Sequence, residues 1–258
     1  MEAARRMRRR LALGAGVLVG AVVALIGVEL VLIGRREFLP MDPGYRIDEV
    51  IPAPGGATRD PLRLAVLGDS TVAGVGSPTE AESLAVLIAD RVASATGRPV
   101  HVVGFGVAGA RTATVLRDQL PGLEGPWDAI VLVVGANDAT HATPWPRLRT
   151  DAEAMLRHAT EQSPVVVLAG TPRFHANEII PEPLRTMVDR YAGLLRGEQR
   201  AAVAAVAGAR FVDLAAEASP RFLGRPEATS VDGFHPSPVG YGFWADAIAP
   251  AVVAGIPG

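Results

Sequence analysis

The chain has 258 residues, a length at the upper end for one α/β domain and short for two full domains. Its residues are 49% hydrophobic and 20% charged, which excludes a disordered, a collagen-like and a coiled-coil chain. The lack of cysteine excludes a disulfide scaffold, a thiolate metal site and cysteine catalysis. The net charge of −2 shows no basic bias, so we expect no nucleic-acid partner.

The amino end of the chain is basic and then apolar. Residues 1–40 carry seven arginines against three glutamates, and five of those arginines precede the apolar run 11–34. As a helix this run would be roughly 36 Å long, and a bilayer core is about 30 Å thick. The sequence therefore predicts a basic cytoplasmic end over 1–10 and a transmembrane anchor over 11–34. The positive-inside rule places the rest of the chain outside the cytoplasm.

A cleaved signal peptide is the alternative for this segment. The basic start fits it, but the apolar run is longer than the usual stretch of about 7–15 residues, and no small-x-small cleavage site follows Val28. We therefore favour a single-pass protein of the cell membrane over a secreted one. Residues 35–60 are rich in proline and glycine and are predicted to be a linker to a domain over 61–258.

From residue 61 onward, predicted strands and helices alternate. The predicted strands are 62–67, 100–103, 129–134, 165–169 and 211–214, and the predicted helices are 80–96, 112–120, 145–161, 183–207 and 238–253. This alternation predicts an α/β fold with three layers (α/β/α), in which a five-stranded parallel sheet has helices on both faces. A ligand in such a fold lies beyond the carboxyl ends of the strands, so polar residues there are the site candidates.

Polar motifs follow the first three predicted strands. Ser70, in Gly-Asp-Ser, is either a nucleophile or a turn or cap serine. The glycine-rich loop 104–109 either directs a backbone N–H into a cleft or is a flexible loop, and it matches no phosphate-binding motif. Asn137, in Gly-Ala-Asn-Asp, has a side-chain N–H that can stabilise an oxyanion, and an Asx turn is the alternative.

Asp232 and His235 lie close together near the carboxyl end, in Asp-Gly-Phe-His. A carboxylate three residues before a histidine can hold one ring nitrogen and leave the other to act as a general base toward a serine. A solvated loop histidine is the alternative. The five histidines include no H-x-x-x-H pair, so we expect neither a metal nor another cofactor.

With these four blocks in this order, the chain resembles the SGNH hydrolases, also called the GDSL esterase/lipase superfamily, over about residues 60–255. The matching residues are Ser70, Gly106, Asn137 and His235, with Asp232 three residues before the histidine. The resemblance implies a flavodoxin-like sheet and a triad of Ser70, His235 and Asp232. It also implies an oxyanion hole made by the N–H groups of Ser70 and Gly106 and by the side chain of Asn137.

The chain departs from the family pattern in the second block. Family members often carry asparagine two residues before the second-block glycine, and this chain has Gly104 there. Gly109 is therefore an alternative to Gly106 as the donor. Asp138 is an alternative to Asp232, although the spacing to the histidine favours Asp232.

Two further residues are candidates for binding the substrate. His141 follows Asn137 closely, and Phe105 lies in the second block. Phe174, Phe234 and Trp244 also fall near the predicted cleft, and helix packing is the better explanation for Trp244.

The resemblance implies a serine esterase that hydrolyses carboxylic esters through an acyl-enzyme. Its substrate would be a small-molecule, glycan or lipid ester. One alternative is an envelope acyltransferase that passes the acyl group to a glycan or lipid hydroxyl. A non-catalytic membrane-tethered binding module is disfavoured, because the matching serine, asparagine and histidine are all present. Neither the acyl length nor the oligomeric state follows from the sequence.

Overall fold

The computed structural model of the chain describes residues 2–56 and 59–256, and in the first helix it describes the side chains of residues 7, 16 and 20–34. The strands are β1 (Asp48–Ile51), β2 (Leu62–Gly68), β3 (Val100–Gly106), β4 (Ala129–Val133), β5 (Val166–Ala169) and β6 (Ala209–Val212). The helices are α1 (Glu2–Gly34), α2 (Leu84–Thr96), α3 (Thr112–Thr114), α4 (Ala136–Thr140), α5 (Trp145–Gln162), α6 (Leu184–Ala204), α7 (Leu214–Glu217) and α8 (Pro238–Val253).

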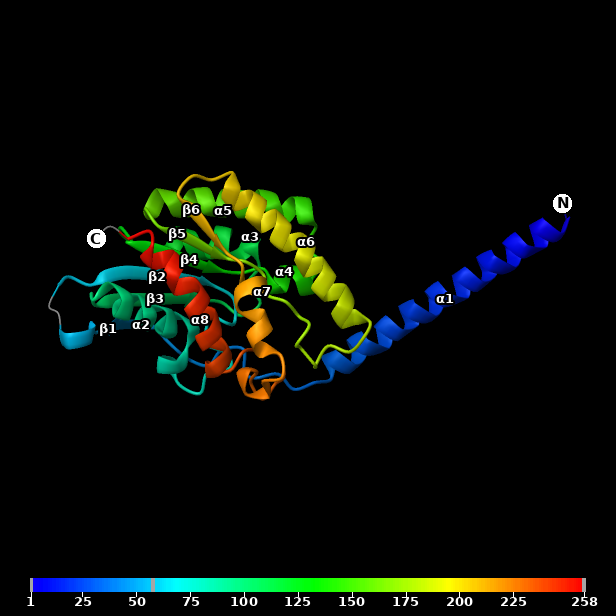
Figure 1. Cartoon of the computed structure of the whole chain (residues 1–258), viewed down its shortest axis with the longest axis horizontal. Helices are drawn as coiled ribbons and strands as arrows, with labels where there is room; N and C mark the ends of the chain where they lie inside the picture. The colour runs from blue at the N-terminus through cyan, green and yellow to red at the C-terminus, as the bar shows by residue number, and fades with distance from the viewer. Residues whose placement is uncertain (1, 57–58, 257–258) are drawn as a thin grey trace.

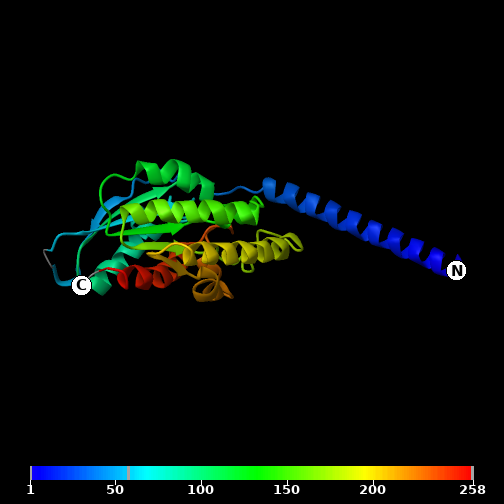
Figure 2. The same ribbon diagram turned by 90° about the horizontal axis from the view of Figure 1, so that it is seen from above.

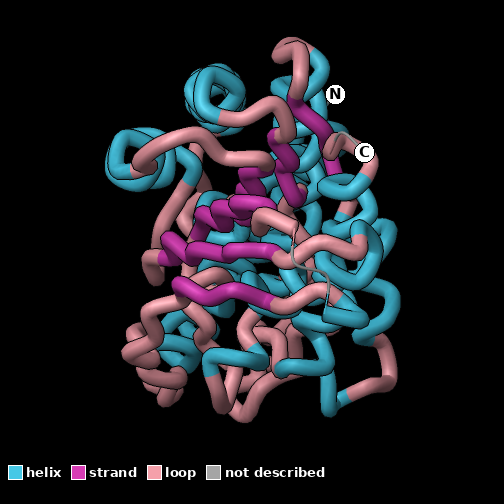
Figure 3. Tube along the Cα trace, turned by 90° about the vertical axis from the view of Figure 1, so that its left-hand side faces the viewer, coloured by secondary structure: helices cyan, strands magenta, loops and turns pink. Residues whose placement is uncertain are grey.

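The strands form one twisted sheet in the order β1-β3-β2-β4-β5-β6 (Figure 3). β2 to β6 run parallel, and β1 pairs antiparallel with β3 at the edge. The chain starts the parallel sheet in the middle, at β2, then adds β3 on one side and β4 on the other. The carboxyl ends of β2 and β4 therefore flank the point where the strand order reverses, which is where open α/β sheets bind ligands.

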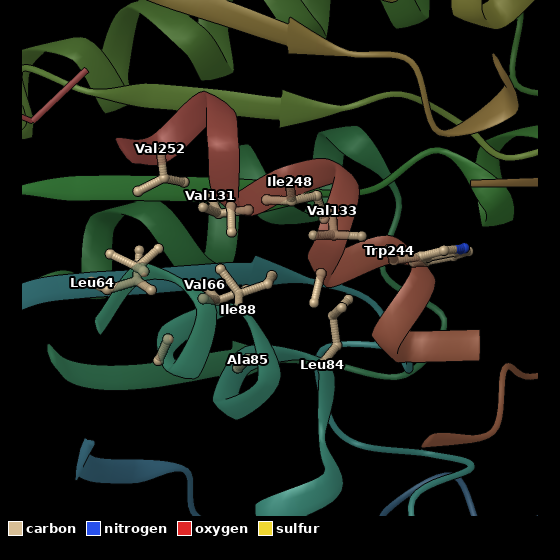
Figure 4. Close-up of a cluster of buried hydrophobic side chains, with 14 of the residues drawn as sticks. Leu64, Val66, Leu84, Ala85, Ile88, Val131, Val133, Trp244, Ile248 and Val252 are labelled. Carbon is tan, nitrogen blue, oxygen red and sulfur yellow. The ribbon is translucent and has the colours of Figure 1, made fainter. Parts of the chain in front are cut away.

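Helices cover both faces of the sheet, and alternate residues of β2 point to opposite layers. Leu64 and Val66 belong to a buried cluster with α2 and α8 (Figure 4), whereas Ala65 and Leu67 belong to one with α5 and α6. Because both faces are covered, the central strands are almost wholly apolar. The predicted α/β fold class is confirmed.

The structure corrects three details of the predicted elements. The sheet of the described residues has six strands instead of five, because 48–51 in the predicted linker pairs with β3. The last strand is 209–212 rather than 211–214, and Leu214 begins α7. The helix predicted over 112–120 is the short α3 followed by a wider turn, in which the Leu120 N–H bonds to the Val115 carbonyl.

The amino-terminal segment is helical, and towards Glu2 it extends away from the domain (Figures 1 and 2). Within the described part of the chain, we find no helix with both the length and the apolar character needed to cross a membrane. The anchor predicted over 11–34 is therefore not supported, and the side chains of 11–15 and 17–19 lie outside the described residues. Glu29 is 3% exposed and its carboxylate accepts a hydrogen bond from the Leu184 N–H, instead of facing solvent.

Candidate active site

Ser70 and His235, which are 165 residues apart, meet at the carboxyl edge of the sheet. The Ser70 Oγ lies 2.9 Å from the His235 Nε2, and the His235 Nδ1 lies 2.7 Å from the Asp232 Oδ2. Since a carboxylate only accepts hydrogen bonds, Nδ1 carries the proton and Nε2 is free to accept one from the serine. Ser70 and His235 are 5% and 2% exposed, so this relay is shielded from water.

The turn that carries Ser70 depends on a glycine at the end of β2. A Cβ on Gly68 would lie 2.1 Å from the Val133 carbonyl oxygen, so only glycine lets β2 approach β4 this closely. The backbone N–H and C=O of Gly68 both bond to the side-chain amide of Gln119, at 3.0 and 2.8 Å. The strand end that precedes the serine is thereby held rigid.

Asp232 accepts four hydrogen bonds at the end of a tight loop. Its Oδ1 accepts from the Ser230 hydroxyl and from the N–H groups of Phe234 and His235, and its Oδ2 faces the His235 ring. Burial raises the pKa of this carboxyl, but the hydrogen bonds from the His235 ring and these other donors outweigh burial and hold the pKa well below its usual range. Asp232 is therefore ionised at neutral pH.

The histidine loop is fastened to the turn that follows the serine. The Tyr241 hydroxyl, in the first turn of α8, donates to the Val75 carbonyl. Burial, together with the charges of Asp69 and Asp232, raises the pKa of Tyr241 well above its usual range, so the hydroxyl keeps its proton as a donor. Gly76 packs directly on the Pro236 carbonyl, where a Cβ would lie at 2.2 Å. These contacts set the distance between the two loops.

Asn137 lies in α4, immediately after β4, and lines the same pocket as Ser70 and His235. Its side-chain Nδ2 donates to the Ala110 carbonyl at 3.1 Å and lies 3.5 Å from the Asp69 Oδ2. Asp69 in turn accepts from the N–H and hydroxyl of Thr71. Burial raises the pKa of Asp69, opposed by the hydrogen bonds from Thr71. The asparagine thus joins the loops after β2, β3 and β4.

Three of the predicted site residues lie elsewhere. Gly106 packs against the turn after Ser70, where a Cβ would lie 2.0 Å from the Ala73 nitrogen, and it lines a separate groove. Phe105 does not line the pocket with Ser70; its ring packs edge-on against Trp127. His141 is exposed at the end of α4, with Nδ1 2.9 Å from the Asn137 carbonyl oxygen, and is not among the pocket residues.

Gly109, the alternative donor in this loop, lies next to a residue that Asn137 contacts. It has φ of +78°, which glycine adopts without strain, and a Cβ there would meet nothing within 4 Å. The next residue, Ala110, accepts the hydrogen bond from Asn137. The turn at 109–110 is therefore joined to Asn137 directly, whereas Gly106 is not.

The pocket continues from Ser70 towards the carboxyl ends of β5 and β6, with a cavity volume of about 80 Å³. Sequence reasoning missed Arg173 and Asn177, which line it from the loop between β5 and α6. For Trp244, which also lines it, packing was the favoured explanation. The strand-end rule applied to β5 would have found this loop. Ser219 and Phe222 follow α7 and carry no sequence signal.

The described residues contain no group of three or more histidine, aspartate or glutamate side chains that could hold a metal ion.

Comparison with known proteins identifies relatives over most of the chain. The model of the GDSL-like lipase/acylhydrolase family matches residues 66–243. A GDSL-like esterase of Mycobacterium tuberculosis is 31% identical over 249 residues, which cover 90% of this chain and 79% of that protein. A GDSL lipase of the same organism is 29% identical over 256 residues, covering 93% and 94%. The crystal structure of phospholipase A1 from Streptomyces albidoflavus is similar in fold, with a TM-score of 0.55 at 22% identity, over 76% of this chain and 100% of that one.

Proposed function

Because this chain belongs to the GDSL-like lipase/acylhydrolase family and is a carboxylic ester hydrolase, we propose that it works through a Ser70-His235-Asp232 triad and an acyl-enzyme. The observation that carries the proposal is the continuous relay from Ser70 Oγ to His235 Nε2 at 2.9 Å and from Nδ1 to Asp232 at 2.7 Å. A serine hydroxyl is a weak nucleophile by itself and needs such a base.

In the first half of the reaction, the Ser70 Oγ attacks the ester carbonyl while its proton moves to His235 Nε2. Asp232 stabilises the resulting imidazolium and keeps the ring in the orientation that faces the serine. His235 then gives the proton to the alcohol oxygen as the carbon–oxygen bond breaks, and the acyl group stays on Ser70. In the second half, His235 Nε2 takes a proton from water as the water oxygen attacks the acyl-enzyme. The bond between the acyl group and the Ser70 Oγ then breaks, His235 returns the proton to Oγ, and the acid is released.

The negative charge on the tetrahedral oxygen needs hydrogen-bond donors. The Asn137 side chain and the Ser70 N–H are two of them in this proposal, because Asn137 lines the pocket with Ser70. As the third donor we propose the backbone N–H of Gly109 instead of the backbone N–H of Gly106. Gly106 is packed against Ala73 and lies in another groove, whereas Gly109 precedes Ala110, the residue that holds the Asn137 amide.

The test is covalent labelling of the full chain with a fluorophosphonate, combined with hydrolysis of p-nitrophenyl acetate. We expect the wild type to be labelled and to release a burst of p-nitrophenol, as an acyl-enzyme predicts. Ser70→Ala should lose the label, and its kcat should fall by at least about 10³-fold.

Ser219→Ala is the matched control, because Ser219 is also buried and lines the same pocket. This variant should keep the label. Labelling or a burst that persists in Ser70→Ala would place the nucleophile elsewhere and reject the triad.

A further inference from the structure

Large aromatic side chains line part of the pocket beside Ser70. Phe222 and Trp244 line it together with Ser70 and His235. An acyl group bonded to Ser70 has to stay in the site after the alcohol has left. We therefore assign the part of the pocket beside the buried Trp244 to the acyl part of the ester. A cavity of about 150 Å³ holds a benzene ring. The volume of about 80 Å³ here corresponds to roughly three or four non-hydrogen atoms beyond the carbonyl.

Trp244 brings a polar atom to this part of the pocket lining. The residue is 5% exposed, and within the described residues its indole Nε1 has no hydrogen-bond partner. Figure 4 shows the indole at the edge of the core cluster, with its nitrogen directed away from the aliphatic side chains and towards the carboxyl edge of the sheet. The indole N–H can only donate a hydrogen bond, and burying a donor without an acceptor destabilises the folded protein.

We propose that the part of the pocket beside Phe222 and Trp244 is an acyl subsite for a short chain that carries an acceptor oxygen, which the Trp244 N–H binds. This inference rests on the proposed triad, because an acyl subsite requires an acyl group on Ser70. The preferred acyl groups have roughly three or four non-hydrogen atoms beyond the carbonyl, one of them an ether, keto or hydroxyl oxygen. A purely aliphatic group of the same length fills the space but leaves the indole N–H unpaired.

The test compares two esters of equal length, p-nitrophenyl methoxyacetate and p-nitrophenyl butyrate, on the full chain. The ether oxygen of the first replaces a methylene of the second. The Trp244→Phe variant keeps an aromatic ring and removes the N–H. We expect the ratio of kcat/KM for methoxyacetate over butyrate to fall about threefold to tenfold in this variant, the usual effect of one neutral hydrogen bond. The intrinsic reactivity of each ester is the same for both enzymes and cancels in the comparison.

Trp127→Phe is the matched control. Trp127 is 4% exposed and its Nε1 is also without a partner in the described residues, but it lies in the cluster on the other face of the sheet and does not line the pocket. Its ester ratio should equal that of the wild type. If Trp244→Phe hydrolyses both esters with an unchanged ratio, the subsite is wrong and the esterase mechanism stands. If neither ester is hydrolysed in a Ser70-dependent manner, the proposed mechanism itself fails.

If the Trp244→Phe variant shows no cooperative unfolding transition, it is not folded and its kinetics cannot test the subsite. The wild-type enzyme alone then provides the test. Its ratio of kcat/KM for the two esters, divided by the ratio of their rates with hydroxide, should exceed about threefold. A corrected ratio of one or less would overturn the subsite.

Discussion

Asp232 is buried, and burial disfavours the ionised form of a carboxyl group. Burial alone would raise its pKa, yet the hydrogen bonds it accepts lower the pKa below the value of about 3.9 expected for an unfolded chain. The folded state therefore binds the proton of Asp232 less tightly than the unfolded state does. Its contribution to stability is fully present above the unfolded pKa and is lost as the pH falls through the folded pKa.

The Asp232→Asn variant tests this charge. We expect a lower Tm than the wild type at pH 5, and a difference in Tm that narrows as the pH is lowered towards 3, because the wild-type carboxylate loses its advantage there. Thermal unfolding followed by circular dichroism at each pH measures the difference. A difference in Tm that widens as the pH falls from 5 to 3 would mean that the pKa of Asp232 in the folded state is not lowered.

The helices are tied to the strand ends by buried side-chain amides. Gln199 of α6 is fully buried; its Oε1 accepts from the N–H and hydroxyl of Thr171, and its Nε2 donates to the Val134 carbonyl. The side-chain amide of Gln119 likewise accepts a hydrogen bond from the Gly68 N–H and donates one to the Gly68 carbonyl. Each amide bonds to backbone groups where the strands end, so the site loops start from fixed positions.

Replacing Gln199 by leucine should lower the free energy of unfolding by about 2–4 kcal/mol, because the Thr171 N–H and the Val134 carbonyl would remain buried without partners. Urea unfolding measures the change. Gln162→Leu is the control, since Gln162 is half-buried and makes one long hydrogen bond of 3.4 Å to Leu120. It should cost less than about 1 kcal/mol. Equal losses in the two variants would contradict the role of Gln199.

Over the whole molecule, the amino-terminal segment reaches the active-site loop. Ile33 packs on the cluster that includes Phe174, and the Phe38 ring meets Phe234 edge-on, with centroids 6.0 Å apart. Phe234 in turn meets the His235 ring at 5.1 Å. A continuous row of contacts therefore runs from the end of α1 to the proposed general base.

Phe38→Ala in the full chain should lower the free energy of unfolding by about 1 kcal/mol, the usual effect of an aromatic pair. It should also reduce kcat/KM severalfold, because Phe234 would pack less firmly against His235. Met41→Ala is the control: Met41 lies in the same segment and is 46% exposed, against 39% for Phe38. If both variants retain wild-type kcat/KM, the segment does not influence the site.

The sequence alone determined the order of the elements and the residues that follow the strands. Apolar runs of strand length that alternate with helical periods permit few arrangements other than a covered parallel sheet. Because parallel strands all end at the same edge, Ser70 and Asn137 had to approach one another, and both line one pocket with His235. This part of the site is local in origin: each residue is placed by the strand just before it.

Only the tertiary structure decided which side chains line that pocket and which pack elsewhere. The pattern around 104–109 does not distinguish Gly106, which packs on Ala73, from Gly109, which precedes the residue that Asn137 contacts, because these contacts involve residues distant in the chain. The same holds for Phe105, which packs on Trp127, and for Trp244, which lines the pocket. Periodicity shows that a side chain is apolar and on which face it lies. It does not show where along that face the packed layer ends and the cavity begins, since that depends on the volumes of neighbours from other elements.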